Sequence, residues 1–343
     1  MLTKIGLDLG YANITLSNIA SEVYREPSVV LVDKDTRRVI AVGNRAASGE
    51  DDIKNGMLVR PFKNGLLYSA DLTEEIIRNA IQVVDNKDRI RCLIALASDF
   101  LGKQEGEVFK MLYDAGVSEC YSVNPAVASL IGAGYSPLMS AVSVNVGASS
   151  TEIAILHRGN VILTKRESIG GEDFDKAVKE YIFSQGDMTV SLLVARQIKE
   201  RLGAVWRGRE SDSVEIEGTL ALTGNRVRMN ISTEDIVGVF EKPLQKLLLA
   251  VANAVKKIPP ECVEDIFENG IILSGGSASI YGLDTMMNKV FDIPVLLAKN
   301  PIDCTSKGLA RINQFLPVKM KGNGKNITSQ LSKLYENKTQ LKR

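Results

Sequence analysis

Three glycine turns directly follow apolar runs in this sequence, at Gly10, at Gly147 and at Gly275–Gly276. A glycine after a buried strand has no Cβ, so the backbone amides of the turn can approach a phosphate group closely. Any one of these turns is more often just a tight connection between strands. Two such turns that face each other can clamp a triphosphate, and Asp8 and Asn145 stand two residues before the first two. The pattern therefore points to nucleotide chemistry.

The histidine and cysteine content limits the kinds of reaction that this protein could catalyse. His157 is the one histidine, which argues against a His-based metal site and against a Ser-His-Asp triad. The four cysteines, Cys92, Cys120, Cys262 and Cys304, lie too far apart for a CxxC metal or redox pair, so reduced buried thiols are expected. Any reaction would therefore use carboxylates, amides, hydroxyls, lysines or a bound metal and nucleotide.

The turns sit within an alternation of short β-branched runs and helical patterns, which predicts an α/β fold. Residues 4–10 are a predicted strand with 12–19 as its antiparallel partner, and residues 141–156 repeat this design. The repeat predicts two related halves that face one another. Helices are predicted over 72–84 with Thr73 as N-cap, over 105–116, 173–183 and 234–257, and a further strand over 270–276.

The length of 343 residues is enough for two domains of roughly 150 residues each. The formal charge of +1 comes from 42 basic and 41 acidic residues, which are unevenly placed. Between Pro317 and Arg343, seven basic residues stand against the single acid Glu336, and this composition predicts a flexible tail, with a short helix over LSKLYENKTQLKR as the alternative. No stretch reaches roughly 18 uninterrupted apolar residues and the start does not resemble a secretory signal, so we expect a soluble protein.

A series of segments along residues 4 to about 316 resembles the actin-like ATPases, specifically the bacterial rod-shape proteins of the MreB type. IGLDLGYANI is similar to the first phosphate loop of that family, VNVGASSTEIAI to the second, and GIILSGGSASIYGLD to the adenosine loop. Other similar stretches include REPSVVLVD, LVRPFKNGLL, SIGGEDFDKAV and QIKERLGAV. Chance supplies one glycine loop readily, but not so many segments in the same order.

The resemblance implies a U-shaped, two-lobed ATP-binding fold that polymerises into protofilaments and, in rods, organises wall synthesis beneath the inner membrane. Each lobe would hold a large subdomain of ribonuclease-H-like topology and a smaller one. The implied division is 1–32, 57–140 and 303–317 for the large and 33–56 for the small subdomain of lobe I, then 141–184 and 256–302 for the large and 185–255 for the small subdomain of lobe II. Residues 318–343 lie outside the resemblance.

The resemblance also implies site residues. Asp8 would hold Mg²⁺ through water and, with Asn145 and Asn124, would stand at the catalytic positions. The other candidates would contact ATP: Gly10, Tyr11, Ala12 and Asn13 in the first loop, Gly147, Ala148, Ser149 and Ser150 in the second, and Lys199, Glu200, Gly275, Gly276 and Ser277 at the adenosine.

Several positions depart from the family in ways that bear on catalysis. Tyr11 and Ile14 replace two threonines of the first loop, and Asn145 replaces the aspartate that begins the second. Asn124 stands where the family has the glutamate that orients the attacking water. An amide keeps the hydrogen bonds but loses the charge that would hold Mg²⁺ or polarise water. We therefore expect ATP to be bound but hydrolysed slowly.

Two other functions on the same fold stay open, a small-molecule kinase and a plasmid-segregation actin. A kinase would use an acid near the second loop as its base. The amide at Asn145, the missing glutamate and the lack of a substrate-domain insertion argue against it.

The main expected partner is the chain itself, as a filament-forming homopolymer, with inner-membrane wall-synthesis proteins as further partners and no nucleic acid. The family's apolar membrane loop is replaced by the charged run Asp85-Asn86-Lys87-Asp88-Arg89. The 318–343 tail offers another contact with an anionic leaflet, although a solvated tail is the plainer expectation. We expect a cytoplasmic protein, at the inner face of the membrane if the tail binds there.

Overall fold

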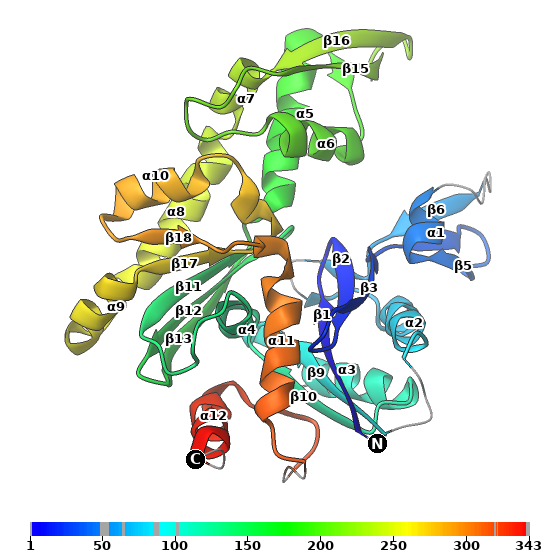
Figure 1. The fold of residues 1–343 in the computed structure, drawn as a ribbon. Coiled ribbons are helices and arrows are strands. Elements are labelled where there is room, and N and C mark those ends of the chain that lie inside the picture. Colours follow the sequence, from blue (N-terminus) through cyan, green and yellow to red (C-terminus); the bar gives the residue numbers. More distant parts are fainter. Residues whose placement is uncertain are drawn as a thin grey trace.

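The computed structural model describes residues 2–48, 55–63, 66–84, 89–100, 103–318, 320 and 322–340. It has two lobes that meet at their base (Figure 1). The main sheet of lobe I contains β1 (Leu2–Leu9), β2 (Asn13–Ser17), β3 (Glu22–Pro27), β9 (Arg89–Ala95), β10 (Glu119–Val123) and β19 (Lys325–Asn326). The main sheet of lobe II contains β11 (Ala141–Val146), β12 (Thr151–His157), β13 (Asn160–Glu167), β17 (Ile271–Ser274) and β18 (Val295–Leu297).

Both main sheets are built in the same way. The order is β3-β2-β1-β9-β10 in lobe I, with β19 added next to β10, and β13-β12-β11-β17-β18 in lobe II. In each sheet the first three strands of the chain pair with one another antiparallel, and the next two strands extend the sheet from the first strand through parallel pairs. The shared topology agrees with the predicted duplicated, actin-like α/β fold.

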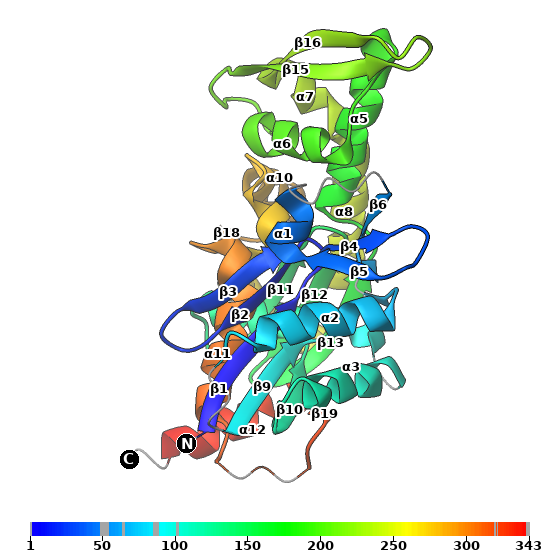
Figure 2. The same ribbon diagram turned by 90° about the vertical axis from the view of Figure 1, so that its right-hand side faces the viewer.

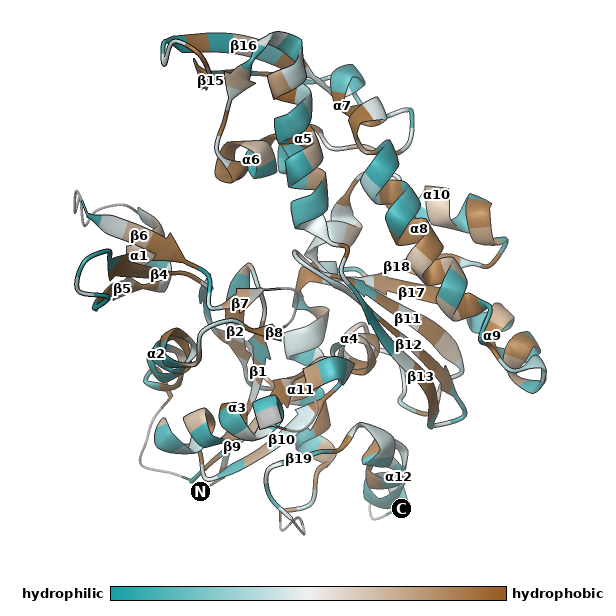
Figure 3. Ribbon diagram, turned by 180° about the vertical axis from the view of Figure 1, so that it is seen from behind, coloured by the Kyte–Doolittle hydropathy of each residue, from teal (hydrophilic) through white to brown (hydrophobic). Residues whose placement is uncertain are grey.

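Helices cover both faces of each main sheet. Lobe I carries α2 (Ala70–Ile81) and α3 (Lys103–Asp114) on its outer face (Figure 2). The outer face of lobe II is covered by α5 (Gly171–Gly186), α8 (Glu241–Val255), α9 (Val263–Asn269) and α10 (Leu283–Phe291). In Figure 3 the strands β11, β12 and β17 are mostly apolar, as expected of strands that are buried on both faces.

The helices α4 (Pro125–Gly132) and α11 (Cys304–Phe315) lie between the two main sheets and join the lobes. They cross so closely that a Cβ on Gly308 would lie 1.8 Å from the Ala128 carbonyl oxygen. A Cβ on Gly132 would lie 1.7 Å from the Cys304 carbonyl oxygen. Because these atoms belong to the backbone and cannot rotate away, the two glycines set the distance between the helices, and with it the fit of the lobes.

Each lobe carries a smaller sheet. Lobe I has β4 (Val30–Asp33), β5 (Val39–Val42) and β6 (Gly56–Val59) with α1 (Gly43–Ser48), and lobe II has β14 (Met188–Thr189), β15 (Ser213–Leu220) and β16 (Arg226–Ser232) with α6 (Leu192–Leu202) and α7 (Thr233–Val239). The short β7 (Phe62–Lys63) and β8 (Leu66–Leu67) pair with each other. The residue boundaries given above for the four subdomains stay predictions.

Two details of the predicted helices are wrong. Thr73 is not an N-cap, because α2 begins after Ser69 and the Thr73 hydroxyl donates to the Ser69 carbonyl at 2.7 Å. The predicted helix over 234–257 is two helices, α7 and α8, separated at Phe240. Pro243 explains the break, because proline is tolerated in the first turn of a helix but not in its interior.

The end of the chain is folded, which corrects the predicted flexible tail. β19 pairs with β10, and α12 (Leu331–Gln340) packs against α11 at the base of the molecule (Figure 1). Ile327 and Leu331 are buried, and the Tyr335 ring meets that of Phe315 edge-on with centroids 5.4 Å apart. The prediction relied on the excess of basic residues in this segment. It overlooked these apolar residues, which recur at helical spacing and lie on the same side of the segment.

None of the described helices is long and apolar enough to cross a membrane. Of the charged connection over residues 85–89, residues 85–88 lie outside the described part of the chain.

Candidate functional site

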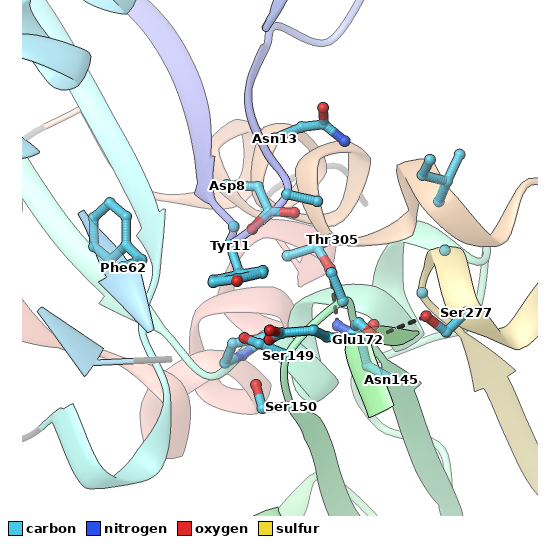
Figure 4. Close-up of a pocket in the computed structure, with 18 of the residues that line it drawn as sticks. Asp8, Tyr11, Asn13, Phe62, Asn145, Ser149, Ser150, Glu172, Ser277 and Thr305 are labelled. Carbon is cyan, nitrogen blue, oxygen red and sulfur yellow. Dashed lines mark hydrogen bonds between the residues drawn. The ribbon is translucent and has the colours of Figure 1, made fainter. Parts of the chain in front are cut away.

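A cavity of about 570 Å³ lies between the lobes, where the glycine turns follow β1, β11 and β17. Figure 4 shows side chains from both lobes pointing into it. Its lining includes Asp8, Asn145 and all the residues predicted to contact ATP, which are Gly10, Tyr11, Ala12, Asn13, Gly147, Ala148, Ser149, Ser150, Lys199, Glu200, Gly275, Gly276 and Ser277. The structure brings all of these together, but Asn124 does not line the cavity.

The β1–β2 loop and the β11–β12 loop have matching backbone geometry. The Gly10 N–H donates to the Asn13 carbonyl at 3.1 Å, and the Gly147 N–H donates to the Ser150 carbonyl at 2.9 Å. In the middle of each turn, the amides of Ala12 and Ser149 have no acceptor among the described residues. Two facing turns with unpaired amides therefore form a site suited to an anion.

Asp8 is the carboxylate of the first loop. Burial raises its pKa to about 6, and the nearby Arg25 guanidinium opposes this shift. Arg25 itself is held by Glu22 at 2.5 Å and by Asp303 at 2.6 Å. Among the described residues no group of three His, Cys, Asp or Glu could hold a metal ion. One carboxylate fits Mg²⁺ that arrives with phosphates and keeps several of its waters.

Asn145 is the penultimate residue of β11, the central strand of lobe II, and bridges to α11. Its side-chain nitrogen donates to the Thr305 hydroxyl at 3.0 Å. Its side-chain oxygen lies beside Gly275, where a Cβ would come within 2.4 Å of it. Gly275 also has a φ of 89°, in the left-handed region, so this turn requires glycine for both reasons. Asn145 thus ties the end of β11 to α11 and packs closely against the third glycine turn.

Asn124 acts as the N-cap of α4. Its side-chain oxygen accepts hydrogen bonds from the amides of Ala126 at 3.0 Å and Val127 at 3.3 Å, and its nitrogen donates to the Ser98 hydroxyl at 3.1 Å. Asparagine is among the best capping residues. These contacts show that the Asn124 side chain caps α4. The suggestion that Asn124 replaces the family's glutamate in catalysis stays a prediction.

The predicted adenosine side holds a buried ion pair. Lys199 lies 2.7 Å from Asp175 and donates to the Gly171 carbonyl at 3.0 Å. Burial raises the pKa of Asp175, while Lys199 opposes the shift. The Ser277 hydroxyl donates to the Gly147 carbonyl at 2.8 Å and so ties the third glycine turn to the second. These contacts brace the start of α5 against the cavity wall.

Tyr11 brings an aromatic ring into the first loop. The Arg60 guanidinium lies 5.1 Å from the centre of this ring and donates to the Tyr11 carbonyl at 2.9 Å. Burial raises the pKa of Tyr11, and the Glu172 carboxylate of α5 adds to this shift. Figure 4 shows Tyr11 and Glu172 on the inner surfaces of the two lobes. Tyr11 of lobe I and Glu172 of lobe II therefore influence each other across the cavity.

Sequence reasoning missed Glu152, which lies in the cavity lining and is 5% exposed. Burial raises its pKa to about 8, and the Arg166 guanidinium opposes this shift. The signal was its place directly after the second glycine loop, at the start of a strand that is otherwise apolar up to His157. Arg25, Arg60 and Glu172 also line the cavity; they lie in the stretches REPSVVLVD, LVRPFKNGLL and SIGGEDFDKAV that resemble the family, but were not named as site residues.

Comparison with known proteins agrees with this geometry. Residues 2–320 match the family described as MreB/Mbl protein. The cell shape-determining protein Mbl of Bacillus cereus is 28% identical over 313 residues, which cover 89% of this chain and 93% of Mbl. The cell shape-determining protein MreB of Escherichia coli is 27% identical over 317 residues, which cover 89% of this chain and 91% of MreB.

Two solved structures share the fold. The ADP-bound crystal structure of MreB5 of Spiroplasma citri has a TM-score of 0.85 at 22% identity and covers 91% of this chain and 96% of MreB5. The MamK double helical filament has a TM-score of 0.79 at 19% identity and covers 92% of this chain and 100% of MamK. Because the family match extends over nearly the whole chain, this protein belongs to the MreB/Mbl family.

Proposed function

We propose that this chain is an actin-like cytoskeletal protein that binds ATP with Mg²⁺ between its lobes. It assembles with copies of itself into cytoplasmic filaments that act in cell-shape determination or in organising wall synthesis. The observation that carries this proposal is the pair of matching turns with unpaired amides, which face one cavity in a chain of the MreB/Mbl family. The relatives named as cell shape-determining proteins and the MamK filament support the cellular role and the assembly.

The residues present fit Mg²⁺–ATP. The amides around Ala12 and Ser149 would hold the phosphates, Asp8 would hold Mg²⁺ through water, and the wall formed by Lys199 and Ser277 would lie against the adenosine. Bound ATP supplies the phosphoryl group for hydrolysis. The amides at Asn145 and Asn124 leave the two family carboxylates missing, so hydrolysis is slow.

Pelleting and negative-stain microscopy test the assembly. Purified protein is incubated with Mg²⁺–ATP, with Mg²⁺–ADP or without nucleotide, and phosphate release is followed in the same samples. We expect ordered filaments with ATP and slow phosphate release. Turnover as fast as that of ordinary family members would contradict the slow-hydrolysis part. Soluble monomer that phosphorylates small metabolites would instead favour the kinase.

We also propose that basic residues of the 318–343 tail contact the membrane. Lys333 is exposed on α12, and Lys342 and Arg343 follow it in the sequence. Clustered basic residues are attracted to anionic lipids by about 1 kcal/mol each. Filaments held at the inner face of the membrane in this way could meet inner-membrane wall-synthesis proteins.

A further inference from the structure

Glu152 is a buried carboxyl group in the cavity, and the Asn124 amide is its polar neighbour on the side of α4. Glu152 is the second residue of β12, and both of its carboxylate oxygens are shielded from solvent without a hydrogen bond of ordinary length to any described residue. Asp175, by contrast, pairs with Lys199, and Glu172 lies 3.3 Å from Lys176. Buried polar groups are nearly always hydrogen-bonded, so a carboxyl that faces a cavity without such a bond points to a missing ligand.

The alternation of β12 aims Glu152 toward the space between the lobes. Ile153 and Ile155 belong to the core of lobe II, whereas Ala154 and Leu156 pack with α4. Glu152 shares the face of Ala154, because side chains two residues apart lie on the same side of a strand. It therefore lies on the inner side of the sheet, two residues after Ser150 of the second loop.

The residues that lie opposite Glu152 on the neighbouring strands bond to other partners, so the carboxyl group can accept a proton. Arg166 lies directly opposite it on β13, and the Arg166 guanidinium bonds to Asp99 at 2.6 and 2.9 Å. Asn145 lies opposite it on β11 and bonds to Thr305. Burial is the main cause that raises the pKa of Glu152; the Arg166 guanidinium lowers it, the Asp99 carboxylate raises it, and a side-chain hydrogen bond with Asn124 lowers it. A group with a pKa near neutral is suited to general-base catalysis.

We propose that Glu152 orients the water that attacks the γ-phosphate of ATP and accepts its proton, in place of the carboxylates missing at Asn124 and Asn145. The water oxygen forms a bond to the γ-phosphorus as the bond from that phosphorus to the β–γ bridging oxygen breaks. The bridging oxygen leaves with the electron pair on ADP, and Glu152 holds the water proton until phosphate or solvent takes it. This inference rests on the proposed nucleotide site.

Single-turnover phosphate release, with the protein in excess over Mg²⁺–ATP and at a concentration that binds all of the ATP, tests the proposal. Glu152→Gln keeps the size of the side chain but cannot accept the proton, so we expect the rate to fall by about 100-fold or more. The affinity for a fluorescent ATP analogue should stay unchanged, which shows that the variant is folded. Glu217→Gln, on exposed β15 and paired with Arg226, is the matched control and should hydrolyse like the wild type.

The pH dependence gives two further readouts. The wild-type rate should rise with pH between about 7 and 9, because only the ionised group accepts a proton, and Glu152→Gln should remove this rise. Without nucleotide, a pKa that is higher in the folded state than in the unfolded state makes wild-type stability fall as pH rises from about 5 to 8. The melting temperature of Glu152→Gln should lack this part of the decline.

The outcomes separate the two proposals. If Glu152→Gln binds the analogue and releases phosphate as fast as the wild type, Glu152 is not the base and the nucleotide site stands. If the wild type binds the analogue but never releases phosphate, the base is again rejected while the site stands. If the wild type does not bind the analogue, both proposals fail.

Discussion

If Mg²⁺–ATP binds in the cavity as proposed, the residue at position 145 would set how much negative charge faces the metal. Asn145→Asp restores a carboxylate at this position while keeping the side-chain size. A second carboxylate near Asp8 should attract the metal, and we expect Mg²⁺ to tighten nucleotide binding about tenfold more than in the wild type, an effect of roughly 1.4 kcal/mol. Titration of a fluorescent ATP analogue with Mg²⁺ and with a chelator measures this difference.

Thr305→Ala is the control for Asn145→Asp. It removes the hydrogen-bond partner of Asn145 without adding charge, so it should leave the Mg²⁺ effect unchanged. The same small Mg²⁺ effect in the wild type and in Asn145→Asp would show that position 145 does not face the metal.

The sequence predicted which residues meet in the cavity better than it predicted what their side chains do. Gly147 and Gly275 follow β11 and β17, which are neighbours in the lobe II sheet, so their turns converge at one edge of that sheet. Gly10 follows β1 in the lobe I sheet, and its place opposite them was expected from the repeated strand–turn–strand design. The capping role of Asn124 depends on where α4 begins. The exposure of Glu152 to the cavity depends on which face of β12 meets α4, and strand alternation alone does not show this.

At the level of helices, the crossing of α4 and α11 holds the lobes together. Gly308→Ala would place a Cβ 1.8 Å from a backbone oxygen, and overpacking of this kind costs about 1–3 kcal/mol or more. We expect a loss of about 3 kcal/mol in the free energy of unfolding, measured by urea denaturation. Nucleotide affinity should fall as well, because the helices must separate.

Gly106→Ala in α3 is the matched change, because a Cβ there meets no atom within 4 Å. Alanine favours helix over glycine by about 0.8–1.0 kcal/mol, so this variant should be slightly more stable than the wild type. Equal stability of Gly308→Ala and the wild type would mean that the helix crossing can relax.

The elements that the sequence predicted best are those with a strong local pattern. The strand–turn–strand units of both lobes follow from alternation and glycine turns. The folding of the tail was missed because its stability comes from contacts distant in sequence: β19 pairs with β10, and Asn323 accepts a hydrogen bond from the Cys120 amide at 2.8 Å. Local composition carries little information about such contacts.

For the whole molecule, charge is concentrated where the chain ends. The basic residues after Pro317 outnumber the acids there by seven to one, while acids outnumber bases in the rest of the chain. The folding of α12 fixes part of this charge at the base of the molecule, beside the ends of both lobes (Figure 1). A filament would repeat the basic site in every subunit, and multivalent attachment strengthens a weak contact.

Co-sedimentation with phosphatidylglycerol vesicles tests this attachment. Deleting residues 318–343 would uncover the core around Phe315, so we compare charge variants instead. The triple variant Lys333→Gln, Lys342→Gln and Arg343→Gln removes about 3 kcal/mol of attraction, and the bound fraction should fall sharply at low salt. The same number of charges removed from α8 and its end, with Lys242→Gln, Lys246→Gln and Lys256→Gln, should leave most binding intact. Equal binding by the two triple variants would reject the tail as the membrane contact.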